Sequence, residues 1–351
     1  MLIPEDDLPL HQLPLPLAHS MNGHPNAYDR FWFNGYSHEG YFAVAMGLYP
    51  NRGVIDAAFS FTDGVTQRSV FAGDLLVGRP TKVGPITIEI TEPLKVNRVI
   101  VDAPEHGIVC DLTYRSRTNA FEEARQAMHD GPRIFMEVTR ATQLGEWSGS
   151  LEVDGSHVSV EGWRGTKDRS WGVRPVGEPL PGAPGSRAPQ LCFLWAPINF
   201  DDGGVHYMSF DEADGRRVSR TCLEVPLAGD ARAAEGRLVI APMVGTRRAA
   251  GATLFVDESP ISLSPELTFH MRGAGYSHPK YAHGRFHGGP YVDGEVLDVE
   301  SLDPLEFSNL HVQQVVRASA RGKEGLGVLE SIIVGPYEPM GLTGLFDGAA
   351  G

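Results

Sequence analysis

The amino-acid sequence predicts an all-β protein with few and short helices, on three observations. The chain has 41 glycines and 26 prolines among its 351 residues, and these residues interrupt it too often for long helices. Apolar and polar residues alternate along most of its length, as they do in half-buried strands. The pair Asp154-Gly155 separates two such runs and is typical of a tight hairpin turn with positive φ.

In chain order, the clearest strand signals lie at 41–48, 86–90, 96–101, 151–153, 156–160 and 312–319. One short helix is expected at about 119–129, because Asn119 can cap its first turn and Glu122 and Glu123 suit a helix N-terminus. Strands of this kind close either into a sandwich or into a barrel, and alternation alone does not choose between the two.

The length of the chain predicts two domains, since one domain takes roughly 100–200 residues. Residues 49–64 align without a gap with residues 200–215, and both segments are typical of a strand, a glycine-containing turn and a second strand. The alternative is that two hairpins resemble each other by chance. We expect an N-terminal arm at 1–30, a first β-domain at 31–175, a Pro/Gly-rich linker or loop at 176–190 and a second β-domain at 191–351.

Charge and cysteine content argue against several classes of protein. Lys and Arg number 30 against 44 Asp and Glu, and the formal charge of −14 repels nucleic acid and anionic membrane surfaces. The three cysteines are widely spaced and predict neither a disulfide framework nor a zinc site. The N-terminus lacks the pattern of a signal peptide, and no run of about 18 apolar residues follows. We expect a cytoplasmic protein without stable membrane insertion.

Common nucleotide-binding, hydrolase and zinc-protease motifs do not occur in the sequence. It contains no GxGxxG after a strand, no GxxxxGK[ST], no GxSxG and no HExxH. Catalysis, if the chain performs any, is therefore expected to use no cofactor.

The densest group of charged and aromatic residues lies at 162–174. Its principal members are Trp163, Lys167, Asp168, Arg169, Trp171 and Arg174. Buried charges need partners, so one interpretation is an ion-paired plug that closes a barrel end. In the other, Lys167, Asp168 or Arg169 faces a ligand cavity that has the tryptophans as its apolar walls. The residues themselves leave both interpretations open.

The stretch Lys167-Asp-Arg-Ser-Trp-Gly-Val-Arg174 resembles the lipocalin-like superfamily of hydroxyneurosporene synthase, a carotenoid hydratase, which has tocopherol-cyclase-like and Diels–Alderase-type relatives. Residues 276–284 and 325–336 resemble an uncharacterised bacterial branch of it. The resemblance implies two consecutive calycin-like β-barrels. It also implies a hydrophobic pocket in which double bonds are hydrated, cyclised or rearranged without a cofactor. The resemblance does not imply a particular substrate, because members of this superfamily act on unrelated molecules.

A second group of polar side chains lies in the glycine-rich stretch 273–290. Its histidines and tyrosines are Tyr276, His278, Tyr281, His283 and His287. Three histidines could hold a metal ion, but their spacing on an irregular loop defines no ligand geometry, and we expect no metal. The other interpretations are a solvated loop and a set of groups that transfer protons or orient a ligand.

The tetrapeptide Gly-Tyr-Ser-His occurs twice, at 35–38 and at 275–278. In the first copy, Tyr36 and His38 with the adjacent Glu39 form a compact acid/base set just before a strand, unless the repetition is turn chemistry alone. Trp32 belongs to an aromatic run that is either core or a binding surface. His206 is expected at the surface, since strand alternation turns it away from Tyr207.

The function that these observations favour is a cofactor-independent lyase, a hydratase or an enzyme of related C–O or C–C bond chemistry. It would act by acid/base catalysis on a hydrophobic terpenoid or aromatic molecule. The expected catalytic residues are Tyr36, His38, Lys167, Asp168, Arg169, Tyr276 and His278. The expected substrate-binding residues are Trp32, Glu39, Trp163, Trp171, Arg174, Tyr281 and His283. The alternatives are a non-catalytic carrier of an apolar ligand and an isomerase or cyclase on the same substrates; a homodimer is left open.

Overall fold

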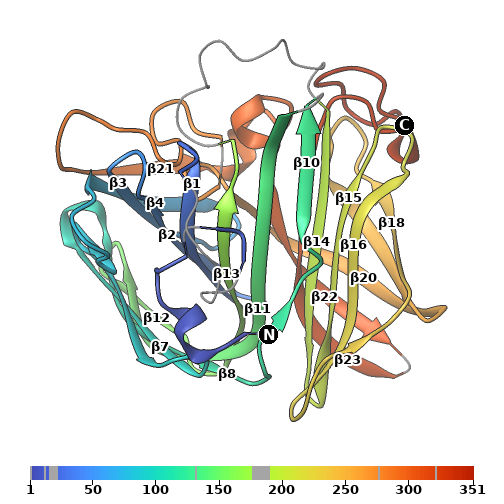
Figure 1. The fold of residues 1–351 in the computed structure, drawn as a ribbon. Helices are drawn as coiled ribbons and strands as arrows, with labels where there is room; N and C mark the ends of the chain where they lie inside the picture. The colour runs from blue at the N-terminus through green and yellow to red at the C-terminus, as the bar shows by residue number, and fades with distance from the viewer. Residues whose placement is uncertain are drawn as a thin grey trace.

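The computed structural model describes all residues except 1, 12, 16–22, 131–132, 176–189, 276 and 321. The protein is all-β, and two curled antiparallel sheets form two consecutive lipocalin-like barrels, as predicted. In Figure 1 the strands of the first half of the chain lie on the left with β21 (Tyr291–Asp298), and the other strands of the second half lie on the right. Among the described residues the helical segments are 3-10 turns of three or four residues: η1 (Pro4–Asp7), η2 (Pro104–His106), η3 (Val299–Ser301), η4 (Phe307–Asn309) and η5 (Glu338–Met340).

The first sheet has the strand order β21-β4-β3-β2-β1-β13-β11-β8-β7-β6-β5, and β9, β10 and β12 pair with β11. Its strands are β1 (Ala27–Tyr36), β2 (Tyr41–Tyr49), β3 (Val54–Thr62), β4 (Thr66–Leu75), β5 (Lys82–Val83), β6 (Ile86–Glu92), β7 (Val96–Ala103), β8 (Ile108–Ser116), β9 (Phe121–Glu122), β10 (Gln126–Asp130), β11 (Arg133–Val153), β12 (Ser156–Ser159), β13 (Trp163–Val173) and β21 (Tyr291–Asp298). Strand β21 comes from the second half of the chain and extends the first sheet beside β4.

The second sheet has the strand order β17-β16-β15-β14-β23-β22-β20-β19-β18. Its strands are β14 (Leu191–Phe200), β15 (Gly203–Asp211), β16 (Arg217–Pro226), β17 (Arg232–Ala233), β18 (Gly236–Pro242), β19 (Ala249–Val256), β20 (Ser259–His270), β22 (Val312–Ala320) and β23 (Lys323–Val334).

Both halves of the chain close in the same way, because the first long strand of each half pairs with the last strand of that half. Strand β1 pairs with β13, and β14 pairs with β23. The sequence match between 49–64 and 200–215 does not follow this relation. It joins β2 to β3 in the first half but β14 to β15 in the second, so the two hairpins are one strand out of step.

The helix expected at 119–129 is wrong: β9 and β10 occupy this segment and pair with β11. Phe121 and Glu123 are buried while Glu122 between them is exposed, which is the period of a strand. Pairing with β11 overrides the local helix signals. The other sequence-predicted strands and the Asp154-Gly155 turn are confirmed, and both turn residues have positive φ.

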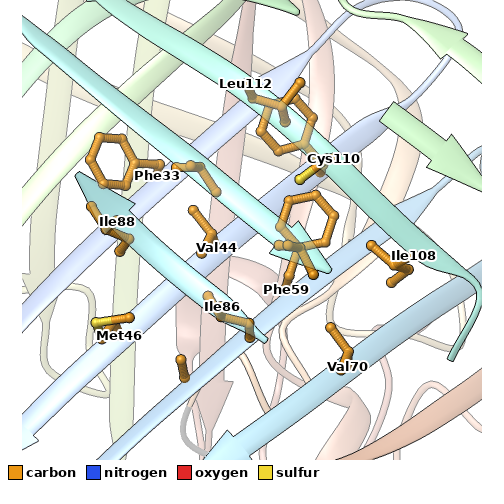
Figure 2. Close-up of a cluster of buried hydrophobic side chains, with 14 of the residues drawn as sticks. Phe33, Val44, Met46, Phe59, Val70, Ile86, Ile88, Ile108, Cys110 and Leu112 are labelled. Atoms are coloured by element: carbon orange, nitrogen blue, oxygen red, sulfur yellow. The ribbon is translucent and has the colours of Figure 1, made fainter. Parts of the chain in front are cut away.

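Each barrel has its own apolar core. Figure 2 shows part of the first, in which Phe33, Val44, Phe59 and Leu112 come from four different strands. All three cysteines are buried and unpaired. No helix in the described part of the chain has the length and apolar character to cross a membrane.

Candidate active site

Strand β1 turns alternate side chains to opposite sides. Phe31 and Phe33 belong to the core of the first barrel. Trp32 and Tyr36 belong to a separate buried cluster that includes Phe269 of β20 from the second sheet. We call this contact region the seam: the faces of β1, β2, β3, β11 and β13 that meet β14, β20, β22 and β23. The seam differs from the barrel cores because it contains many buried polar side chains.

Hydrogen bonds cross the seam between the two sheets. The Asn199 side chain on β14 donates to the Tyr36 hydroxyl at 2.9 Å, and the Asn34 side chain donates to Gln313 on β22 at 3.1 Å. Burial raises the pKa of Tyr36 to about 12, so its hydroxyl stays protonated near neutral pH. These contacts fix β1 against the second sheet.

Trp32 and Asp168 lie directly opposite each other in the β1–β13 ladder. Arg140 Nε lies 2.8 Å from Asp168 Oδ2, while Asp168 Oδ1 is buried and has no hydrogen-bond partner among the described residues. Burial raises the pKa of Asp168 above its ordinary value, although the charge of Arg140 opposes this shift. Asp168 therefore combines one anchored oxygen with one that is unengaged.

Arg140 joins Asp168 to a second buried carboxylate, Glu123, at 2.9 Å. Glu123 also accepts hydrogen bonds from Thr142 and Trp195, each at 2.9 Å, and lies 2.9 Å from His206. Burial alone would raise the pKa of Glu123, but Arg140 and His206 hold it at about 2. Glu123 is thus an ionised anchor that keeps Arg140 in place.

A third polar group lies where the 271–290 loop of the second half meets β2 and β3. The Tyr49 hydroxyl lies 3.3 Å from Asp56 Oδ1 and 3.0 Å from His283 Nδ1, and Gly284 N donates to Asp56 Oδ2 at 2.6 Å. His283 Nε2 lies 3.0 Å from the Ala274 carbonyl. A carbonyl only accepts, so Nε2 carries the proton and Nδ1 accepts from Tyr49. Burial raises the pKa of Asp56 to about 7 and lowers that of His283.

Six of the sequence-predicted site residues are buried at the seam or beside it: Trp32, Tyr36, Asp168, Arg174, Tyr281 and His283. The Arg174 guanidinium lies 3.9 Å from the centre of the Tyr28 ring and donates to Ser170 Oγ at 3.0 Å. Ser170 is the ladder partner of Arg30 and lies two residues from Asp168 on β13, so Ser170 and Asp168 face the same side of the strand. The hydrogen bond to Ser170 holds the Arg174 guanidinium on that side.

Lys167, Arg169 and Trp171 lie on the opposite face of β13, against the N-terminal arm. Lys167 forms an ion pair with Asp7, and Arg169 forms one with Asp29 at 2.6 Å. Trp171 Nε1 donates to the carbonyl of Leu15 at 2.8 Å. This face of β13 therefore carries buried ion pairs, and its residues lie apart from the seam. Trp163 packs in the core of the same barrel.

His38 and Glu39 lie in the exposed turn between β1 and β2. The side chain of His38 is 63% exposed and lies 2.6 Å from Glu266. It lines an open groove of about 610 Å³ that also includes Arg164, Asn199 and Arg317. His38 and Glu39 therefore do not join the buried polar set of the seam.

His278 and Tyr281 pack together over Phe71 of β4, and Phe71 and Tyr281 belong to the same buried cluster as Trp32. His278 Nδ1 accepts from the backbone N–H groups of Lys280 and Tyr281, and its Nε2 lies 3.3 Å from Glu295. These contacts fix the loop. Tyr276 lies outside the described residues. The described part of the chain contains no group of three or more His, Cys, Asp or Glu arranged to hold a metal ion.

Sequence reasoning missed Arg30, Asp56, Glu123 and Arg140, which complete the seam. Arg30 is hidden in an aromatic run, and only its two-residue spacing from Trp32 shows that the two share a face. Glu123 was assigned to a helix. His206, expected at the surface, is fully buried because the segment that contains Phe121 and Glu123 covers its side of β15.

The two curled sheets and the polar region between them define a two-barrel, lipocalin-like protein. The chain matches the model of a family of unknown function, DUF8625, over residues 2–343, and it belongs to that family. No curated protein is detectably similar to it in sequence.

Several solved structures share the fold. A candidate AttH from Nitrosomonas europaea is 12% identical with a TM-score of 0.55, over 87% of this chain and 92% of that one. CghA solved with Sch210972 is 12% identical with a TM-score of 0.51, over 93% and 97%. Kievitone hydratase from Nectria haematococca is 13% identical with a TM-score of 0.48, over 87% and 88%. The first two likenesses establish the fold, which is the one that the resemblance of the 167–174 stretch implied.

Proposed function

We propose that this protein is an acid/base enzyme that transfers protons at a double bond of a hydrophobic small molecule bound at the seam, without a cofactor. The reaction class is hydration or the reverse elimination, with isomerisation and cyclisation as related outcomes. The observation that carries the proposal is Asp168, a buried carboxyl group with one oxygen anchored by Arg140 and the other unengaged beside Trp32.

The environment of Asp168 suits proton transfer. A general acid or base works best when its pKa lies near the working pH, and burial moves the pKa of Asp168 in that direction. Glu123, two ion pairs away, is held ionised, so the two carboxyl groups take different roles. Trp32 lies opposite Asp168 and Ala45 lies opposite Trp32 in the neighbouring ladder, so the seam has an apolar wall on one side of this carboxyl group.

The test uses the full chain with a panel of terpenoids and unsaturated aromatic compounds in heavy-oxygen water and in deuterated water, read by mass spectrometry. Oxygen label indicates hydration, and deuterium alone indicates isomerisation. We expect Asp168→Asn to lower label incorporation about 10²-fold or more, the size of a lost general acid or base.

His38→Ala is the matched control, because this exposed histidine lies outside the seam, and we expect parental incorporation from it. The melting temperature of each variant separates loss of chemistry from loss of fold. Parental incorporation by a folded Asp168→Asn variant would contradict the proposal. Tight binding of panel compounds without label from either water would instead identify a carrier.

A further inference from the structure

Arg30 is a buried cation that has no carboxylate at ion-pair distance among the described residues. It is 7% exposed, and one of its terminal nitrogens donates to the Ala274 carbonyl at 2.5 Å. Its Nε has no hydrogen-bond partner in the described part of the chain. Its charge acts on two buried carboxyl groups nearby, since it opposes the rise that burial causes in the pKa values of Asp56 and Asp168.

Trp32 presents a second unmatched donor two residues further along β1. Its side chain is 3% exposed, and its indole Nε1 has no partner among the described residues. Buried indole N–H groups ordinarily find an acceptor, as Trp147, Trp171 and Trp195 do in this chain. Trp32 thus differs from three other buried tryptophans of the same molecule.

The two donors belong to one local site. Positions 30 and 32 of a strand face the same side, and the Arg30 guanidinium carbon lies 5.2 Å from the centre of the Trp32 ring. Asp168, with its unengaged Oδ1, is the ladder partner of Trp32, so its Cβ lies roughly 5 Å away. The seam therefore offers two N–H donors next to one carboxyl oxygen.

We propose that Arg30 and Trp32 bind a substrate oxygen that gains negative charge during the reaction, and that the substrate is a hydrophobic compound whose reacting double bond is conjugated to a carbonyl group. This inference rests on the proposed function and names its substrate class. N–H donors fixed in a buried site stabilise an oxyanion more strongly than water does, because they need no reorganisation.

The chemistry balances with water as the co-reactant. Ionised Asp168 takes a proton from water as the water oxygen bonds to the β-carbon. The electron pair of the double bond then forms an enolate, whose oxygen Arg30 and Trp32 hold. Asp168 returns the proton to the α-carbon, which gives the β-hydroxy carbonyl compound and the original carboxylate. The reverse sequence is elimination of water.

The test uses 4-nitrophenol as a stand-in for the enolate, because its absorbance reports ionisation of its oxygen. Its methyl ether, 4-nitroanisole, has the same size and cannot ionise. A purely apolar site would raise the pKa of bound nitrophenol by desolvation, whereas paired donors would lower it. We expect the bound phenol to ionise about one pH unit or more below the free phenol, a tenfold change in its ionisation constant.

Trp32→Phe keeps the aromatic ring and removes the donor, so it should reverse part of the shift in a folded protein. Arg30→Gln should remove the remainder. Trp163→Phe, in the core of the first barrel, is the matched tryptophan control and should behave as the parent. A bound phenol with an unchanged or raised pKa overturns the inference, as does the absence of phenol binding. If either of these results is obtained with nitrophenol but nitroanisole still binds at the seam, the inference is wrong and the proposed function is not contradicted.

Discussion

Lys167 and Asp168 are neighbours in the chain, yet their side chains lie on opposite faces of β13 and belong to different parts of the molecule. Lys167 pairs with Asp7 of the N-terminal arm inside the first barrel, and Asp168 pairs with Arg140 at the seam. The charged residues of the stretch 162–174 are therefore divided between two faces of a single strand, and on each of these two faces a buried charge has an ion-pair partner.

We expect Asp7→Asn and Lys167→Met each to lower the free energy of unfolding by about 3–5 kcal/mol, because each leaves its partner charged and buried. The variant that carries both substitutions should lose less free energy of unfolding than the two single variants lose together. Ligand-probe binding at the seam should stay parental in whichever variants remain folded. Denaturant titration measures the first effect, and nitroanisole binding measures the second. Loss of probe binding in a folded Lys167→Met variant would move this residue into the site.

Gly47 makes room for the Tyr49 hydroxyl, since a Cβ at this position would collide with that oxygen. Gly47→Ala should lower the free energy of unfolding by about 1–3 kcal/mol, the range of overpacked sites. Gly289→Ala is the control, because no atom lies within 4 Å of its Cβ position, and it should stay within about 0.5 kcal/mol of the parent. Adding Tyr49→Phe to Gly47→Ala should recover part of the loss. Equal stability of the two alanine variants would refute the packing argument.

Alternation and local residue types predict the strands, whereas the two barrels follow from the resemblance carried by residues 167–174. Trp32 and Asp168 could be selected from the sequence as aromatic and charged residues. Their pairing could not, because it depends on the β1–β13 register, which joins segments far apart in the chain. The same limit explains Glu123, since only its contacts with Arg140, Trp195 and His206 distinguish it from a helix-terminal glutamate.

Asp56 should make the protein less stable as the pH rises. Burial raises its pKa in the folded state to about 7, whereas the unfolded chain titrates near the ordinary value of about 3.9. The folded state therefore holds the proton more tightly, and the free energy of unfolding falls by about 4 kcal/mol between roughly pH 4 and pH 7. Asp56→Asn should remove this decline, whereas Asp63→Asn, at an exposed position, should preserve it. Melting temperatures across this range measure the difference, and parallel curves for parent and Asp56→Asn would contradict it.

Glu123 should act with the opposite sign. Its pKa in the folded state is held at about 2, below the ordinary value near 4.3, so its stabilising effect is complete above that value and is lost as the pH falls toward 2. At neutral pH, Glu123→Gln removes a buried carboxylate that pairs with Arg140 and keeps the Arg140–Asp168 pair, and we expect a loss of about 3–5 kcal/mol. Glu122→Gln changes the neighbouring, exposed glutamate and should stay within about 0.5 kcal/mol of the parent. Urea titrations at neutral and acidic pH provide the measurement. If the two glutamine variants unfold at the same urea concentration, Glu123 is not the anchor of the Arg140 side chain.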